Sequence, residues 1–477
     1  MPALFRYRFL ITVFLLAVVL FVGGASATTY EADTTANFTT NLSAAENGDT
    51  ILITGDFTVS NVTIDKEITI RSDASHTLTA SSDRLFYINA TGNLTLGDGV
   101  TLTGGSTDYG GAVYVNNGGN FTMSGNSTIT NNTAAYNGGG VYVNESGTFN
   151  MNGGTISNNT AKWGGGVLLY SGTFNMNGGT ITNNTATNGG GVFVNGGTFT
   201  MTGGTISNNT ATYDGGGVYV LNGTFTMNGG TITNNTATSG DGGAVYVNNS
   251  TFNMTGGTIS DNTARNGGGV FTAGTFNMNG GTISGNTANL LGSGVCVWNK
   301  GTFTMSSGTI SGNTANQYGG GVCVWGGTFT MTGSAIVNIN NDVYLTSGTF
   351  ITVIGDLGTG AGARNITPAF TGIGDTVVEY GSVDIHNWSS NFALNTTWIQ
   401  VNQMDLAQSE TNLTLSNNFT VKYYLADSDT NPHDTLTNIT YDAALTPPAA
   451  PTRTGYTFSS WNQGSSSGIP WNFTQTR

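Results

Sequence analysis

The nine residues GGTISNNTA occupy positions 153–161 and return unchanged at positions 203–211. A near-copy, GGTITNNTA, occupies 178–186 and returns at 229–237, and looser copies begin at 256, 280 and 307. A catalytic cleft needs unlike residues at unique positions, whereas a repeated segment builds an extended surface from similar units. The repetition therefore favours an elongated repeat protein over a compact enzyme.

Three short apolar runs recur in every period of 24 to 27 residues. One period contains Phe174-x-Met176, then Ile181, then Val192-x-Val194, with turn-forming Asn and Gly between them. The i, i+2 spacing is that of strands and not of helices. We therefore expect an all-β fold, a right-handed parallel β-helix with three strands per coil and about 25 residues per coil. A left-handed hexapeptide helix would need coils of about 18 residues.

Parallel stacking places each residue on its copy in the next coil, about 4.8 Å away. The second Asn of each N-N-T segment then forms a column of amides that can hydrogen-bond to one another. The predicted asparagine ladder contains Asn132, Asn159, Asn184, Asn209, Asn235, Asn262, Asn286 and Asn313. The residue before it varies, so we expect that residue to face solvent. Four residues at this outer position are candidate N-glycosylation sites: Asn158, Asn183, Asn208 and Asn234.

Composition and the N-terminal residues indicate a secreted or surface-displayed protein. Residues 1–27 are expected to form a signal peptide, with two arginines, an apolar run and an A-x-A cleavage site. The formal net charge is −14 and only 8% of residues are charged, which argues against nucleic-acid binding. We expect a β-helix over residues 28–345, a β-rich transition segment over 346–418 and a C-terminal module over 419–477.

Two glycine-rich segments carry a family resemblance. Gly110-Gly111-Ala112-Val113 and Gly242-Gly243-Ala244-Val245 match a G-G-A-[ILV] element, and Ile156-Ser157-Asn158-Asn159 matches an F-x-x-N element with Ile in place of Phe. The repeats therefore resemble the adhesin-like repeats of chlamydial polymorphic outer-membrane proteins and the pectate-lyase-like right-handed β-helix superfamily. The resemblance implies a fold and a surface role, and is weak for activity.

The C-terminal residues carry a second resemblance. Residues 445–461, LTPPAAPTRTGYTFSSW, are similar to the Listeria–Bacteroides repeat of the internalin B-repeat type, with Ser460 at a usual Gly. The resemblance implies a small β-grasp-like module found on surface proteins. Its usual final strand ends in A-x-W, whereas this chain stops shortly after Trp471, so we expect the module to be incomplete.

The repeats offer few groups for catalysis. Only eight charged residues and no histidine fall between positions 104 and 336. Asp214 and Asp241, in equivalent turns of successive coils, are the best pair for a polysaccharide lyase or glycoside hydrolase. Solvated turn aspartates are the simpler interpretation. We therefore expect no catalytic residue, no metal site and no cofactor.

A stripe of mostly aromatic residues alternates with the inward valines. If the valines point inward, we expect these neighbours to be exposed and to offer flat faces to sugars or a partner protein. The alternative is a self-stacking stripe, or one covered by a loop. The stripe contains Tyr114, Tyr142, Leu168, Phe193, Tyr219, Tyr246 and Phe271.

Cys296 and Cys323 are the two cysteines, and both lie at the centre of V-C-V segments in adjacent coils. In register, their Cα atoms would lie near 4.8 Å, inside the range that a disulfide spans. The spacing allows an inter-coil disulfide without requiring one.

These features together favour a non-catalytic, adhesin-like or structural surface protein. Its expected partners are cell-surface carbohydrate or protein, with no nucleic acid. Membrane contact is expected only through the signal peptide or an anchor outside this chain. The alternative is an enzyme that degrades polysaccharide on a pectate-lyase-like β-helix.

Overall fold

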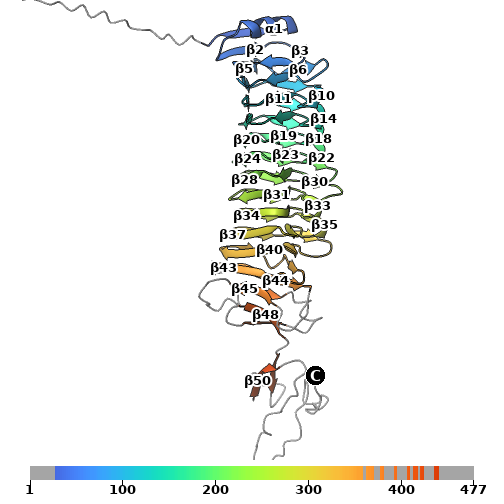
Figure 1. Ribbon diagram of the computed structural model, residues 1–477, viewed down its shortest axis with the longest axis vertical. Coiled ribbons are helices and arrows are strands. Elements are labelled where there is room, and N and C mark those ends of the chain that lie inside the picture. The colour runs from blue at the N-terminus through green and yellow to red at the C-terminus, as the bar shows by residue number, and fades with distance from the viewer. Residues whose placement is uncertain are drawn as a thin grey trace, which may run out of the picture.

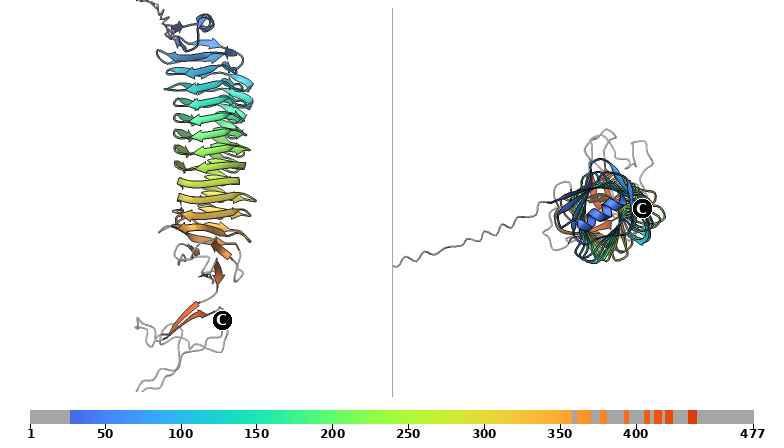
Figure 2. Two further views of the ribbon diagram at one scale, coloured as in Figure 1. Left: turned by 60° about the vertical axis from the view of Figure 1, so that its left-hand side comes forward. Right: turned by 90° about the horizontal axis from the view of Figure 1, so that it is seen from above.

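A computed structural model describes residues 27–357, 361–369, 376–380, 392–394, 405–408, 412–416, 419–423 and 434–439. The predicted signal peptide, apart from Ala27, and the LTPPAAPTRTGYTFSSW motif lie outside these residues. The chain forms a parallel β-solenoid of about 12 turns, in which successive coils stack along the long axis (Figure 1). Seen end-on, the coils superpose as one tube (Figure 2).

One coil shows how the repeat folds. Strands β20 (Thr173–Met176), β21 (Thr180–Thr182) and β23 (Val192–Asn195) join a 39-stranded sheet and enclose the core. Strand β22 (Thr185–Asn188) belongs to a separate nine-stranded sheet. The prediction of three strands per coil therefore missed a fourth. Its T-A segment has a single buried alanine, which is too short a run to show a strand period.

The strands of the repeat fall into four columns. The F-x-M column contains β12 (Asn120–Met123), β16 (Thr148–Met151), β20, β24 (Thr198–Met201), β28 (Thr224–Met227), β31 (Val245–Met254), β34 (Val270–Ser284), β37 (Thr302–Ser311) and β40 (Thr328–Gly333). The isoleucine column contains β13 (Thr128–Thr130), β17 (Thr155–Ser157), β21, β25 (Thr205–Ser207), β29 (Thr231–Thr233), β32 (Thr258–Ser260), the last residues of β34 and β37, and β41 (Ile336–Val337). The V-x-V column contains β11 (Val113–Val115), β15 (Val141–Val143), β19 (Val167–Tyr170), β23, β27 (Val218–Leu221), the first residues of β31 and β34, β36 (Val295–Trp298), β39 (Val322–Trp325) and β42 (Val343–Leu345). The T-A column is β10 (Ser106–Tyr109), β14 (Thr133–Asn137), β18 (Thr160–Trp163), β22, β26 (Thr210–Ala211), β30 (Thr236–Ala237), β33 (Thr263–Asn266), β35 (Thr287–Leu291) and β38 (Thr314–Ala315).

The register explains why the letters repeat. Phe174 pairs with Phe199 in the next coil, and their rings stack with centroids 4.7 Å apart and planes 7° apart. The inward Phe, Met, Ile and Val side chains of the repeats are fully buried. Burying a side chain of this size contributes roughly 1.5–3 kcal/mol. A different ring size in one coil would leave a cavity or a clash in both neighbours.

A short helix covers the N-terminal end of the solenoid (Figure 1). Helix α1 (Thr35–Ala44) begins after Thr34, whose hydroxyl accepts a hydrogen bond from the Asn37 amide. Its fully buried Phe38 packs against Phe57 and Phe86. The β-helix predicted from residue 28 onward did not include this helix. The remaining N-terminal strands are β1 (Thr29–Ala32), β2 (Asp49–Ile53), β3 (Phe57–Val59), β4 (Val62–Ile64), β5 (Glu67–Ser72), β6 (His76–Ala80), β7 (Phe86–Ile88), β8 (Asn93–Leu96) and β9 (Val100–Thr103).

Parallel pairing continues beyond residue 345, the predicted end of the β-helix. Strands β43 (Ile351–Leu357), β44 (Gly362–Pro368), β45 (Thr376–Tyr380) and β46 (Phe392–Leu394) extend the stack. Strand β48 (Asn412–Ser416) then pairs antiparallel with β45 and with β47 (Asp405–Gln408). The C-terminal module is described only by β49 (Phe419–Tyr423) and β50 (Asp434–Ile439), which pair antiparallel. Among the described residues, no helix is both long and apolar enough to cross a membrane.

Candidate functional site

The second Asn of each N-N-T segment lies in one enclosed column. The Asn184 side-chain amide donates to Asn209 Oδ1 at 3.0 Å, and the Asn184 backbone amide donates to the same oxygen at 3.0 Å. Asn184 Nδ2 also donates to the Ile156 carbonyl. The same bonds link the eight residues of the asparagine ladder, and Asn313 donates to a ninth member, Asn341. Asn341 was not predicted, because it lies outside an N-N-T segment.

The residue before each of the eight predicted ladder asparagines has a left-handed backbone. Asn158, Asn183, Asn208 and Asn234 have φ between 54° and 56°, and all four are exposed. Asn, Asp and Gly are the residues that tolerate this conformation best. This explains why Asp261, Gly285 and Gly312 replace Asn at the same position. The four sequon side chains are therefore accessible.

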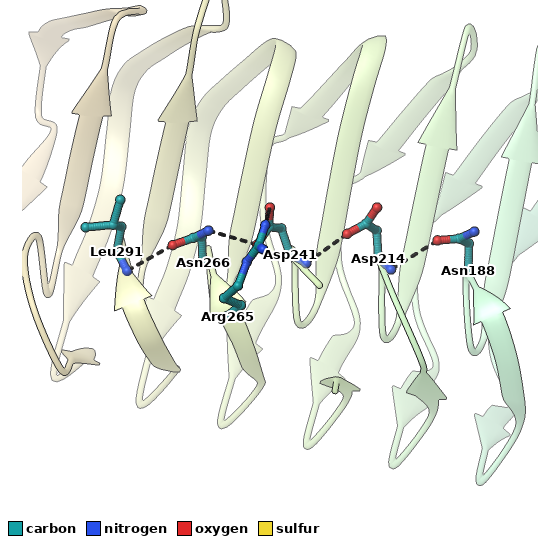
Figure 3. Close-up of polar contacts among 6 residues, drawn as sticks. All are labelled: Asn188, Asp214, Asp241, Arg265, Asn266 and Leu291. Carbon is teal, nitrogen blue, oxygen red and sulfur yellow. Dashed lines mark hydrogen bonds and ion pairs between the residues drawn. The ribbon is translucent and has the colours of Figure 1, made fainter. Parts of the chain in front are cut away.

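The two candidate catalytic aspartates lie next to each other on the outer side of the coil (Figure 3). Asp241 forms a bidentate ion pair with Arg265. The Arg265 Nε atom lies 3.1 Å from Asp241 Oδ1, and Nη2 lies 3.0 Å from Oδ2. Asn266 Nδ2 donates to the same Oδ1 at 2.9 Å. The Asp241 side chain is 10% exposed, whereas that of Arg265 is 52% exposed. The carboxylate therefore accepts three hydrogen bonds from two side chains and is largely covered.

Asp214 belongs to a hydrogen-bonded column that runs through five coils (Figure 3). The Asp214 backbone amide donates to Asn188 Oδ1, and the Asp241 backbone amide donates to Asp214 Oδ1 at 2.9 Å. The column ends where the Leu291 amide donates to Asn266 Oδ1. Burial raises the pKa of Asp214, and the hydrogen bond from Asp241 opposes this. We call Asn188, Asp214, Asp241, Asn266 and Leu291 the outer ladder.

The chemistry of this arrangement is mainly structural. One oxygen of Asp214 and both oxygens of Asp241 accept hydrogen bonds that tie one coil to the next. A glycosidase pair instead keeps a carboxylate on each side of an open cleft. In the part of the chain that the structure describes, no group of three His, Cys, Asp or Glu side chains could hold a metal ion.

The aromatic stripe is covered, so the expectation that it is exposed is wrong. Tyr142, Leu168, Phe193, Tyr219 and Phe271 are each 9% exposed or less, and Tyr114 and Tyr246 are partly buried. The cover comes from the fourth strand and the glycines after it. Trp163 of β18 packs on this cluster, and Leu291 of β35 packs beside Phe271. The stripe forms a second core outside the V-x-V strands.

Glycine is what lets the chain fold back over this stripe. Gly189 has φ 65°, and a Cβ atom there would lie 2.9 Å from the Phe193 Cβ atom and 2.7 Å from the Val192 oxygen. Equivalent glycines stand before Val167 and Val218 with φ 66° and 68°. The G-G-G segment is therefore a tight return that only a residue without a side chain can make.

Exposed aromatic rings lie at positions that the sequence analysis did not select. Tyr109 and Tyr136, in β10 and β14, stack with centroids 5.9 Å apart and are 41% and 45% exposed. Trp325 is 40% exposed and stacks on Trp298 at 5.7 Å. The signal for the tryptophan pair is visible in the sequence, because both residues follow V-C-V two positions after the cysteine.

Cys296 and Cys323 pair in register, but both are free thiols in this structure. The two side chains are fully buried in the cluster that also contains Phe271 and Leu291. A hydrogen bond to Cys323 and burial raise the pKa of the Cys296 thiol well above its usual range. The two buried side chains thus act as small apolar residues of the second core.

A shallow groove of 540 Å³ lies at the corner between the V-x-V and F-x-M strands. It extends over five coils and was not predicted. The lining side chains are hydroxyls, amides, one alanine and one cation, and the lining contains no acidic residue. The lining includes Thr224, Asn249, Ala273, Gly274, Thr275 and Lys300.

Two family comparisons match parts of the chain. The Listeria-Bacteroides repeat domain matches residues 419–477, and the Chlamydia polymorphic membrane protein repeat matches residues 126–144 and 203–221. No curated protein and no solved structure matches the chain at a significant level. The two repeat matches and the β-solenoid indicate an adhesin-like repeat protein of the cell surface or outer membrane.

Proposed function

We propose that this chain is a non-catalytic, surface-displayed β-solenoid that holds cells to carbohydrate or protein by many weak contacts. One observation carries the proposal: the register repeats the same outward side chains on successive coils, as in Thr198, Thr224 and Thr251. Identical contacts at regular spacing add their free energies when one extended partner meets them all. The surface-protein repeats that match the chain support the same role.

Two finer features belong to this proposal. We expect the solenoid to be right-handed and related to the pectate-lyase-like β-helices, because its coils are about 25 residues long. We expect residues 419–477 to form a β-grasp-like spacer. Both follow from the repeat length and the sequence matches.

An attachment assay tests the proposed function. Beads coated with the chain from residue 28 onward are allowed to settle on host-type cells, on immobilised polysaccharides and on matrix proteins, and detachment under flow is measured. We expect attachment that rises steeply with coating density, as multivalent contact requires. Beads coated with the heat-unfolded chain are the control. Attachment equal to this control on every surface would overturn the proposal.

The same samples test the enzymatic alternative. Each polysaccharide is incubated with the chain and its length is then measured by size-exclusion chromatography. We expect unshortened polymer, because the structure uses Asp214 and Asp241 as hydrogen-bond acceptors between coils. Shortening that disappears in the D214N/D241N variant, while binding remains, would establish the enzyme instead.

A further inference from the structure

The A-x-A sequence that predicts signal-peptide cleavage lies directly before the first strand of the fold. Cleavage after this sequence would separate Ala27 from Thr28. The Thr28 carbonyl accepts a hydrogen bond from the Thr50 amide at 2.9 Å, and strand β1 begins at Thr29. Strand β1 pairs in parallel with β2 and so belongs to the first coil. The predicted cut therefore falls at the edge of the solenoid and leaves every described strand in place.

The backbone nitrogen of Thr28 lies against a buried carboxylate. Thr28 N is 2.6 Å from Asp49 Oδ1, and the Glu46 amide donates to Asp49 Oδ2 at 2.8 Å. The Asp49 residue is 5% exposed, whereas Thr28 is exposed. Each oxygen of the carboxylate thus accepts a hydrogen bond from a backbone N–H group. One of these two bonds joins the start of the fold to strand β2.

Asp49 forms no ion pair with a cationic side chain among the described residues. Lys66 acts on it only through the electrostatic field, because the Lys66 ammonium group donates to the Ala45 carbonyl at 2.8 Å. Hydrogen bonds from the Glu46 and Thr28 amides lower the pKa of Asp49, so the side chain is ionised at neutral pH. A covered charge is costly unless an opposite charge lies beside it. The site therefore favours a positive charge at the position of Thr28 N.

We infer that cleavage between Ala27 and Thr28 supplies this charge: the new α-ammonium group of Thr28 forms an ion pair with Asp49 and fastens the first strand to the second. A signal peptidase catalyses the step, and water is the co-reactant. Hydrolysis breaks the peptide bond, the signal peptide leaves with the carboxylate of Ala27, and the Thr28 nitrogen becomes an –NH3+ group. In the precursor the same nitrogen is a neutral amide, so the ion pair exists only in the cleaved chain.

The ammonium group should hold the first coil more firmly than the amide that it replaces. A hydrogen bond between two charged groups is roughly twice as strong as one between neutral groups. Because Thr28 is exposed, solvent screens part of this gain. We expect the local opening of the first coil to become about 3- to 10-fold less frequent after cleavage. The inference is independent of the proposed function, because no adhesion partner takes part.

The first experiment identifies the N-terminal residue of the exported protein. The full chain, residues 1–477, is expressed in a bacterium that secretes it, and the N-terminal peptide is identified by mass spectrometry. We expect Thr28 as the first residue. Exported protein that begins at any other residue, or that is not cleaved, would show that the inference is wrong.

The second experiment compares residues 28–477 with residues 27–477. Both chains are released from a fusion partner by a protease that leaves no extra residue, and both carry an α-ammonium group. Only in the shorter chain is that group on the Thr28 nitrogen. We expect hydrogen exchange over residues 46–50 to be about 3- to 10-fold slower in the shorter chain. Exchange over residues 173–176, far along the solenoid, should be the same in both chains. Equal exchange over residues 46–50 would contradict the ion pair.

Two variants identify the partner of the ammonium group. Asp49→Asn removes the charge but keeps an oxygen for Thr28 N, so the difference between the two chains should vanish. Asp33→Asn is the matched control, because the Asp33 side chain lies near the same end of the solenoid but accepts a hydrogen bond from Asn37. With Asp33→Asn the difference should remain. A difference that persists in Asp49→Asn would mean that another group holds the N-terminus.

A further measurement keeps the test valid if Asp49→Asn does not fold. Enzymatic acetylation of the Thr28 nitrogen in the wild-type chain removes the positive charge without changing any side chain. We expect acetylation to speed exchange over residues 46–50 by the same 3- to 10-fold. Unchanged exchange after acetylation would show that the charge on Thr28 does not stabilise the first coil.

Discussion

Two columns of polar side chains run along the same solenoid under different constraints. In the asparagine ladder, Asn209 accepts two hydrogen bonds from Asn184 and donates to Ile181 and Asn235. In the outer ladder, Asn188 accepts one bond, from the Asp214 backbone amide. The first column is fully enclosed over most of its length and is always Asn. The second is half-buried at Asn188 and Asp214, and its five residues are Asn, Asp, Asp, Asn and Leu. A repeated residue therefore varies less from coil to coil when its side chain makes more hydrogen bonds.

The largest expected effect comes from placing a carboxylate in the asparagine ladder. Asn209→Asp keeps the shape but loses both Nδ2 donors, so an oxygen would face the Ile181 carbonyl and Asn235 Oδ1. We expect the free energy of unfolding to fall by about 3–5 kcal/mol, because buried acceptors lose their donors and a charge is enclosed. Urea unfolding followed by circular dichroism measures the change.

The matched control makes the same substitution in the outer ladder. Asn188→Asp retains an oxygen for the Asp214 amide and lies at a half-buried position. We expect a change below about 1 kcal/mol. If the two variants shifted the urea midpoint equally, bond number would not explain why one column is constant and the other is not.

A smaller effect is expected where the outer ladder contains an ion pair. Arg265→Met keeps much of the side-chain stem but leaves the Asp241 carboxylate with only Asn266 as a side-chain donor. We expect a loss of about 1–2 kcal/mol, less than for a fully buried pair, because the Arg265 side chain is half exposed.

A second substitution tests the origin of this loss. Replacing Asp241 by Asn in the R265M background removes the unpaired charge and should restore most of the stability. A double variant as unstable as R265M would show that the stem of Arg265, and not its charge, is what matters.

The sequence was informative where one coil determines its neighbour. Phe174 and Phe199 must stack, so the period alone indicated the parallel register. The sequence was uninformative about contacts between different strand columns within one coil. Nothing in the V-Y-V segments shows that Tyr142 and Tyr219 are covered. The residues that cover them belong to the T-A strand and to the G-G-G segment that follows it. Helix α1 and the groove depend on features that occur once in the sequence. A search for periodicity does not detect such features.

The same limit explains why the positions of the two aspartates were predicted but their partners were not. The repeat register predicted Asp214 and Asp241 in neighbouring coils. In the structure the Asp241 backbone amide donates directly to Asp214 Oδ1. Their ion-pair partner was not visible from the repeat, because Arg265 comes from the following coil and occurs once in the repeats. Chemistry that depends on a unique residue must be found from the structure.

The smallest effect is expected at Asp214, and it depends on pH. Burial raises the pKa of Asp214, so the folded chain binds this proton more tightly than the unfolded chain, whose pKa is about 3.9. The free energy of unfolding therefore falls as pH rises through the window between the two values, and the penalty persists at neutral pH. Asp214→Asn retains an oxygen for the Asp241 amide and removes the charge. We expect a gain below about 1 kcal/mol at pH 7, because Asp214 is only partly buried, and no gain below the unfolded pKa. Thermal midpoints of both chains from pH 3 to pH 8 measure the difference. A gain of the same size at pH 3 would place its origin in packing, and a loss at pH 7 would mean that the Asp214 charge stabilises the ladder.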